Sequence, residues 1–316
     1  MSDEFLERIR AQPDDDRLRE VYADLLLERG DVRGEFIALQ LKRARGQGTT
    51  VDLRRERELL NTNWHTWAGP LAKALHRDES TFERGFLAHV TIPRVSTPKK
   101  LLAQLPGDPH WATVQSLRNA HVHQFYVPIL LHPILKRLTR ASMDDDELLS
   151  LAEAPWKLEE LILRAWDVRE PLVTALSQFP AFAKLRSLVL STTGLDDVAE
   201  LVPLIEKKIE KLQLFLSEPG APRPLLEFLA ERHCEQQRLD TRTWSLHAQD
   251  KKLELVLRDG SPRSLALATQ LAREFSGHDL QPTTAIWALD PYSEPPKDWS
   301  NLRRALEQAG FAVEAP

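Results

Sequence analysis

The stretch LRSLVLSTTGL, Leu185 to Leu195, decides the fold. Its apolar residues follow the frame L-x-x-L-x-L, in which L stands for any apolar residue. Looser copies of this frame start at Leu87, Val114, Leu135, Leu158 and Ile209, so successive copies begin 21 to 27 residues apart. Alternation at the end of each frame is typical of a strand with one buried face.

A period of about 20 to 29 residues with this frame is the signature of leucine-rich repeats. One repeat cannot bury its own apolar face, whereas stacked repeats form a parallel sheet on one side of a solenoid. The copies at Val114 and Leu135 are weak, because Asn119 and Arg140 occupy their third apolar position. Helix-like stretches lie between the strands, at residues 144–152, where an acidic run marks a helix start, and at 171–179.

Residues 1 to about 77 are predicted to be helical. Apolar residues recur at helical spacing in four segments: around Phe5 to Ile9, from Leu18 to Leu26, from about residue 31 to 45, and from Val51 onward. The acidic run at residues 14–16 could be taken for a metal site, but acids at a helix start favour a helix cap. Gly30 suits the position just after a helix.

The segment DDDRLREVYADLLLERGDVRGEFIALQ, residues 14–40, resembles the bacterial repeat-companion domain, whose signature is D-x-x-R-x-x-Y-A-D-x-L-x-E-R-G-D-x-R-G-E-F-I-x-L-Q. The match is dense over residues 1–45, and the stretches at 67–71 and 84–86 resemble that family's junction into the repeats. Leu26 departs from the family, which often has Trp there. The resemblance implies a helical cap ahead of leucine-rich-like repeats and no established chemistry.

After about residue 238 the frame fades. Residues 244–248 and 253–257 alternate like two strands of a hairpin, and 284–289 form another strand. Helices are expected at 265–275 and 299–309. The expected fold is therefore α/β, with a helical cap over 1–84, an irregular leucine-rich-repeat-like solenoid with a parallel sheet over 85–237, and a small C-terminal α/β domain or solenoid cap over 238–316.

Composition narrows the function. The 316 residues carry 42 basic and 47 acidic side chains, a formal charge of −5, which argues against a general nucleic-acid or anionic-membrane binder. The N-terminus is charged throughout and no apolar run approaches ~18 residues, so we expect a cytoplasmic chain with no membrane segment. One cysteine excludes a disulfide framework. Common phosphate-binding and catalytic motifs are absent from the sequence, and no cofactor is expected.

Three groups of residues could carry chemistry. His121 and His123 form an HxH pair that could bind a metal, with His110 and His132 nearby in sequence. Asp240, Asp259 and Asp290 lie near C-terminal strand ends or turns, where catalytic acids could lie. Cys234 beside His233 is the third group. Surface positions explain the histidines more simply, turn geometry explains the aspartates, and incidental placement explains the cysteine. We therefore expect neither a metal site nor a catalytic residue.

The better candidate is the outward, concave face of the repeat sheet. Four basic residues and one acidic residue among its predicted positions give a local charge of about +3. We therefore expect a non-catalytic module that binds a protein partner with an acidic surface. An inhibitor or immunity-like protein, an enzyme acting through its C-terminal segment, and a structural spacer remain alternatives. The predicted binding residues are His89, Ser116, Arg118, Arg137, Thr139, Glu160, Arg164, Ser187, Lys211, Gln213 and Phe215.

Overall fold

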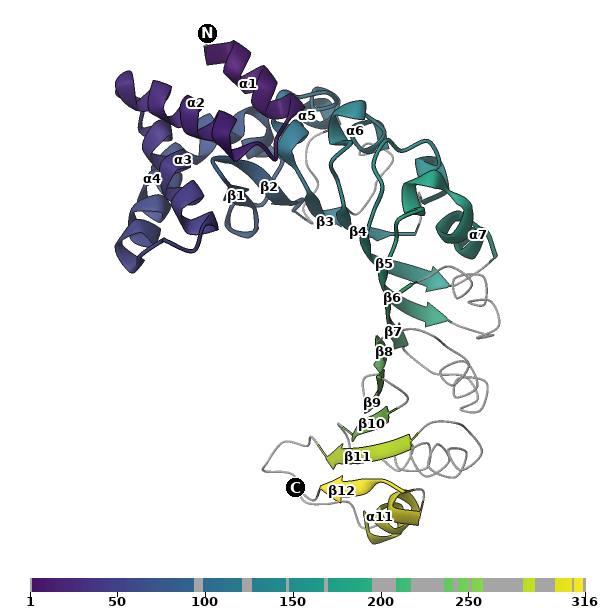
Figure 1. Ribbon diagram of the computed structural model, residues 1–316. Helices are drawn as coiled ribbons and strands as arrows, with labels where there is room; N and C mark the ends of the chain where they lie inside the picture. The colour runs from purple at the N-terminus through teal and green to yellow at the C-terminus, as the bar shows by residue number, and fades with distance from the viewer. Residues whose placement is uncertain are drawn as a thin grey trace. The chain divides into compact units, whose positions relative to one another are not determined.

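The chain is described by a computed structural model (Figure 1), which covers residues 2–93, 99–120, 127–145, 148–167, 170–194, 209–216, 236–240, 244–249, 252–257, 281–287, 299–308 and 310–314. Its contacts divide into two compact units. The first unit contains Met1–Met143 with Ser150–Leu158, and the second contains Asp144–Leu149 with Glu159–Pro316. The chain is a mixed α/β protein with N-terminal helices and a mostly parallel sheet.

Four helices open the first unit, as the sequence predicts: α1 (Ser2–Ala11), α2 (Asp16–Glu28), α3 (Val32–Ala44) and α4 (Thr50–Ala68). The acidic run is a helix cap, because Asp15 accepts hydrogen bonds from the backbone amides of Arg17 and Leu18. Asp31 caps α3 in the same way. Thr49 and Asp52 form a reciprocal capping box on α4. The starts of α2, α3 and α4 are therefore each set by a side-chain cap.

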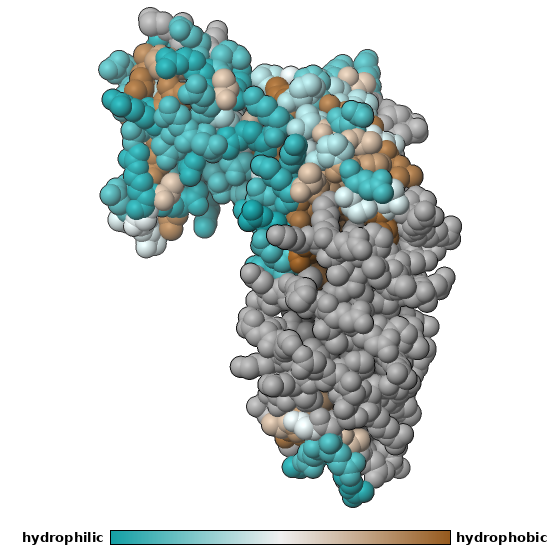
Figure 2. Space-filling view, turned by 45° about the vertical axis from the view of Figure 1, so that its right-hand side comes forward, coloured by the Kyte–Doolittle hydropathy of each residue, from teal (hydrophilic) through white to brown (hydrophobic). Residues whose placement is uncertain are grey.

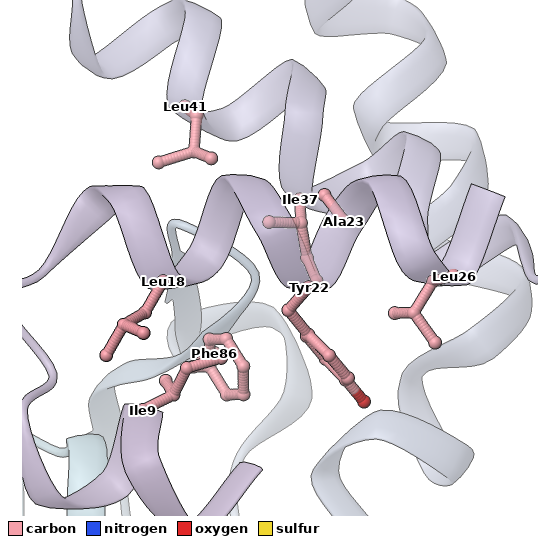
Figure 3. Close-up of a cluster of buried hydrophobic side chains, with 8 residues drawn as sticks. All are labelled: Ile9, Leu18, Tyr22, Ala23, Leu26, Ile37, Leu41 and Phe86. Atoms are coloured by element: carbon pink, nitrogen blue, oxygen red, sulfur yellow. The ribbon is translucent and has the colours of Figure 1, made fainter. Parts of the chain in front are cut away.

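An apolar cluster joins α1, α2 and α3 to the first strands (Figure 3). Tyr22 lies between the rings of Phe5 and Phe86, with centroid distances of 6.4 and 6.5 Å. Gly34 lets α3 approach α2 closely, since a Cβ there would lie 2.6 Å from the carbonyl oxygen of Ala23. The cluster consists of Ile9, Leu18, Tyr22, Ala23, Leu26, Ile37, Leu41 and Phe86.

Aromatic rings join α3 and α4 to the first hairpin. Phe36 packs on Trp67 with ring centroids 4.5 Å apart, and Phe82 meets Phe36 and Trp64 edge-on. Two short 3-10 turns, η1 (Gly69–Lys73) and η2 (Arg77–Glu79), lead from α4 into that hairpin. Helices and hairpin thus share one core.

The first unit has four strands: β1 (Thr81–Glu83), β2 (Phe86–Thr91), β3 (Ser116–Ala120) and β4 (Arg140–Asp144). β1 and β2 are antiparallel, while β2, β3 and β4 are parallel. The connections contain α5 (Lys99–Leu102) with η3 (Pro109–Thr113), and α6 (Val127–Leu130) with η4 (Pro133–Leu135). In Figure 1, α5 and α6 lie on one side of these strands, so the other side is the outward face.

The frame that starts at Leu135 predicts its strand three residues before the position that the structure shows. Leu117 pairs with Ala141, not with Leu138. Leu135 instead ends the 3-10 turn η4, where it is buried. Its place matches that of Trp111 in η3 and Phe182 in η6 (Pro180–Phe182). The correct frame runs from Leu138 through Ala141 to Met143, all of them buried.

The second unit has four strands that pair in parallel: β5 (Glu160–Asp167), β6 (Ser187–Gly194), β7 (Lys211–Leu216) and β8 (Gln236–Asp240). The helix predicted at 171–179 is α7 (Glu170–Gln178). The helix predicted to start at Asp144 is wrong at that residue, since Asp144 ends β4 and the turn η5 (Leu148–Leu151) follows. Strand β8 aligns with β7, although no repeat was predicted there.

Beyond β8, the strands are β9 (Trp244–Gln249), β10 (Lys252–Leu257), β11 (Gln281–Trp287) and β12 (Ala312–Glu314), with helix α11 (Trp299–Gln308) before β12. The predicted hairpin is present as β9 and β10, in which Gln249 pairs with Lys252. β10, β11 and β12 pair in parallel. β12 was not predicted, and the helix expected at 265–275 lies outside the described residues.

Candidate functional site

Strands β5, β6 and β7 display an outward surface made of three rows of side chains. The strands pair in register, so Glu160, Ser187 and Lys211 form the first row. Between the rows, inward residues such as Leu161 and Leu188 are buried. This register agrees with the sequence frames at Leu158, Leu185 and Ile209. The other rows are Ile162, Val189 and Gln213, and then Arg164, Ser191 and Phe215, of which Phe215 is placed by its backbone alone.

The first two residues of the middle row, Ile162 and Val189, are apolar. Ile162 is 45% exposed, and its partner Val189 on β6 is half-buried. Sheet side chains on adjacent strands lie within contact distance, so the pair forms one apolar patch, with polar side chains before and after it on β5 and β6. Ile162 was among the outward positions of the predicted frame but not among the predicted binding residues. An aliphatic residue at an outward frame position is the signal that identifies it.

Charges on this surface balance. Arg164 Nε donates to Asp144 Oδ1 at 2.8 Å, and both side chains are partly buried. Lys211 and Glu160 are both exposed in the first row. Two cations thus accompany two carboxylates, and the basic excess expected from the sequence is absent from the second unit's described outward surface.

In the first unit, His89, Ser116 and Arg140 form one row across β2, β3 and β4. His89 Nε2 lies 2.8 Å from Glu83 Oε1 on β1. Ser116 is buried, so it offers little surface to a partner. Arg118 and Arg140 are exposed on neighbouring strands. These two arginines carry the basic character of this surface.

Arg137 and Thr139 were predicted at outward strand positions, and that placement is wrong, because β4 starts after them at Arg140. Arg137 instead reaches Asp14, with Nη2 2.6 Å from Oδ1. The hydrogen bond from Arg137 holds the pKa of the Asp14 carboxyl below its usual value. Thr139 donates its backbone amide to the Gln115 carbonyl. Arg140, which sequence reasoning missed, takes the outward position.

A proline signal could have corrected this register. Pro109, Pro133 and Pro180 each begin a 3-10 turn. Each proline stands five residues before a frame start, at Val114, Leu138 and Leu185. Proline favours the first position of such turns because it needs no amide donor there. The spacing from proline therefore locates the strand where apolar spacing alone misleads.

The other candidates show no catalytic constellation within the described part of the chain. His110 Nδ1 lies 2.8 Å from Asp108 Oδ1, and His132 Nδ1 accepts from the Ile134 amide as a turn cap. His121, His123, His233, Cys234, Asp259 and Asp290 lie outside the described residues, and of Asp240 only the backbone is described, in β8. No group of three potential metal ligands occurs among the residues searched.

Comparison with known proteins adds no relative, since no protein-family model, curated protein or solved structure matches the chain. The structure's described helices include none that is long and apolar enough to cross a membrane.

Proposed function

We propose that this chain is a non-catalytic protein-binding module whose partner docks on the outward surface of β5, β6 and β7. The carrying observation is the exposed Ile162 beside Val189, flanked along β5 and β6 by polar side chains. An apolar centre with a polar rim is the usual composition of a protein interface. No catalytic residue is required for this function.

Polar side chains around the apolar patch orient the bound partner. Ser187, Ser191 and Gln213 are half-buried, and Lys211 is exposed at the edge of the patch. Short hydroxyl side chains on a strand leave the apolar patch accessible and can hydrogen-bond to a partner. Since sheets hold such side chains at fixed spacing, little conformational entropy is lost on binding.

We also propose that the first unit's own outward surface, where Arg118 and Arg140 are exposed on adjacent strands, binds acidic groups of a protein. Arginine is enriched at interface hot spots and pairs with carboxylates through two parallel hydrogen bonds. The resemblance of residues 14–40 to the repeat-companion domain supports the architecture behind this proposal, because that family places a helical cap ahead of a leucine-rich-like solenoid.

Affinity capture from a lysate of the source organism, followed by mass spectrometry, tests the proposal. The wild type is compared with Ile162→Asp, and Leu149→Asp serves as the control, since Leu149 is 57% exposed but lies in the turn η5. We expect one protein to be enriched by the wild type and by the control and lost with Ile162→Asp. Equal capture by all three proteins, each confirmed folded, would exclude this surface.

A second pair of variants tests the acidic partner. Arg118→Glu with Arg140→Glu reverses both outward charges, while Arg54→Glu with Arg57→Glu reverses two exposed arginines on α4. We expect the first double variant to weaken capture and the second to leave it unchanged. Like charges across an interface cost several kcal/mol, so the loss should be nearly complete. An unchanged capture would remove the acidic-partner element and leave the apolar patch as the docking centre.

A further inference from the structure

A small cavity of about 60 Å³ lies in the first unit, on the inner side of β2. Its wall combines apolar side chains, Leu6, Trp67 and Phe86, with the cationic or ionisable side chains of Arg10, Arg33 and His110. None of the residues that line it is acidic. A partly enclosed space of this composition favours negative charge.

Arg33 is the centre of the cavity's electrostatics. Its guanidinium carbon lies 5.1 Å from the centroid of the Phe86 ring, and Nη2 donates to the Gly85 carbonyl at 3.4 Å. Its Nε atom is buried without a hydrogen-bond partner. Within the described residues no carboxylate oxygen lies within 4.0 Å of this guanidinium. Burial lowers the pKa of Arg33, which reflects the cost of holding that charge in place.

Two further groups face the same space. Arg10 on α1 is half-buried and donates from Nη1 to the exposed Glu7 at 2.6 Å. Asp108 holds His110 of η3 in place. Its carboxylate accepts a hydrogen bond from the His110 backbone amide and also contacts Nδ1 of the ring. The ring lies flat against Gly69, where a Cβ would come within 2.5 Å of Cε1. The three side chains are therefore held in place by separate elements.

The size of the cavity limits the ligand. A cavity of about 60 Å³ admits a ligand of only a few heavy atoms. A guanidinium binds a planar carboxylate through matched parallel donors. Asp31 attracts the Arg33 charge from a distance, but no described carboxylate hydrogen-bonds to the guanidinium, so the buried Nε–H is left without an acceptor that a bound anion would supply.

We propose that this cavity binds a small planar oxyanion of the carboxylate type, of the size of formate or bicarbonate, held by Arg33 and Arg10. His110 closes one side of the site. The site is separate from the outward surface proposed above, and its occupancy stabilises the junction of α1, α3 and the first strands.

Formate serves as the probe, with the full-length chain. Its binding is measured by titration calorimetry and by the unfolding midpoint followed through tryptophan fluorescence. Sodium gluconate, a carboxylate too large for the cavity, keeps the ionic strength constant. We expect saturable binding, with the midpoint rising by ~5–10 °C at a hundredfold excess over Kd. Chloride should give no saturable rise.

Variants assign the effect to the cavity. Arg33→Met should abolish formate binding, and Arg10→Gln should raise Kd by about tenfold or more. Arg8→Gln is the matched control, because it removes one exposed charge from the same helix outside the cavity. If Arg33→Met does not fold, the comparison of formate binding by Arg10→Gln and by Arg8→Gln still tests the proposal. No saturable shift in the wild type, equal binding by those two variants, or equal saturation by chloride would each overturn the proposal.

Discussion

The side-chain oxygen of Gln40 accepts a hydrogen bond from the Gly85 amide at 2.7 Å, although the two residues are 45 positions apart. The Gln40 amide nitrogen donates to the Phe82 carbonyl at 3.0 Å and to Glu56 at 2.8 Å. One buried side chain on α3 thus satisfies both ends of the β1–β2 turn. Gly85 has a φ of 89° and would clash with Ile37 if it carried a Cβ, so the turn fits only against this helix.

Replacing Gln40 by Leu should destabilise the first unit strongly. The Gly85 amide and the Phe82 carbonyl would both lose a partner in a buried place, and each unsatisfied group costs about 1–3 kcal/mol. We expect the free energy of unfolding to fall by about 2–5 kcal/mol, as measured by urea denaturation. Gln47→Leu in the exposed loop after α3 is the control, with an expected change within about 0.5 kcal/mol. A similar small loss for both variants would show that the hydrogen bonds of Gln40 contribute little.

Two glycines of the helical region should respond differently to substitution. Gly34 is packed against the backbone of α2, so Gly34→Ala should cost about 1–3 kcal/mol through overpacking. Gly30 has open space around it and a φ of 73°, which asparagine adopts readily. Gly30→Asn should therefore be nearly neutral in the same denaturation measurement. A reversed order of the two effects would contradict the close packing of α2 and α3.

The helices of the first unit were predictable because their signals are local. Apolar spacing, the caps Asp15 and Asp31, and Gly30 after α2 are all contained within a few residues of the chain. Nothing local indicates that Gln40 reaches Gly85, since the partner is a backbone amide far away in sequence. A buried polar residue on an apolar helix face shows only that a partner exists.

The candidate surface was predictable in part, for a related reason. Alternation along β5 and β6 is unambiguous, and the in-register pairing of Glu160 with Ser187 follows from it. At Leu135 two apolar residues three apart suit either a strand frame or a 3-10 turn. The turn uses Leu135, and tertiary pairing with β3 then selects Ala141 as the inward residue. Periodicity alone does not separate these alternatives for a short segment.

The register of β4 gives a prediction that separates the structure from the sequence frame. Ala141 is 5% exposed and points inward, so Ala141→Asp should destabilise the protein by several kcal/mol, because it buries a charge. Thr139 is half-buried before the strand and bonds mainly through its backbone, so Thr139→Asp should cost about 1 kcal/mol or less. The sequence frame predicts two tolerated changes, since it places both residues outward. Thermal unfolding of both variants decides between the two registers.

The ion pair between Arg137 and Asp14 gives a prediction about pH. The pKa of Asp14 is lowered in the folded chain, chiefly by the Arg137 hydrogen bond, relative to the ordinary value of 3.8. A depressed carboxyl pKa stabilises the fold above the unfolded pKa, and this contribution is lost as the pH falls through the folded pKa. Because Asp14 is 78% exposed, solvent screening keeps the contribution at pH 7 below about 1 kcal/mol.

The measurement is an NMR titration of the Asp14 carboxyl carbon in the wild type and in Arg137→Met. The midpoint should lie below 3.8 in the wild type and return toward 3.8 in the variant. Asp14→Asn should lower the free energy of unfolding slightly at pH 7 and leave it unchanged well below the folded pKa, where the wild-type carboxyl is already neutral. Asp24→Asn, at an exposed position on α2, controls for general charge effects. A normal Asp14 midpoint in the wild type would mean that Arg137 does not pair with Asp14, and the Arg137 charge would then be available to a partner.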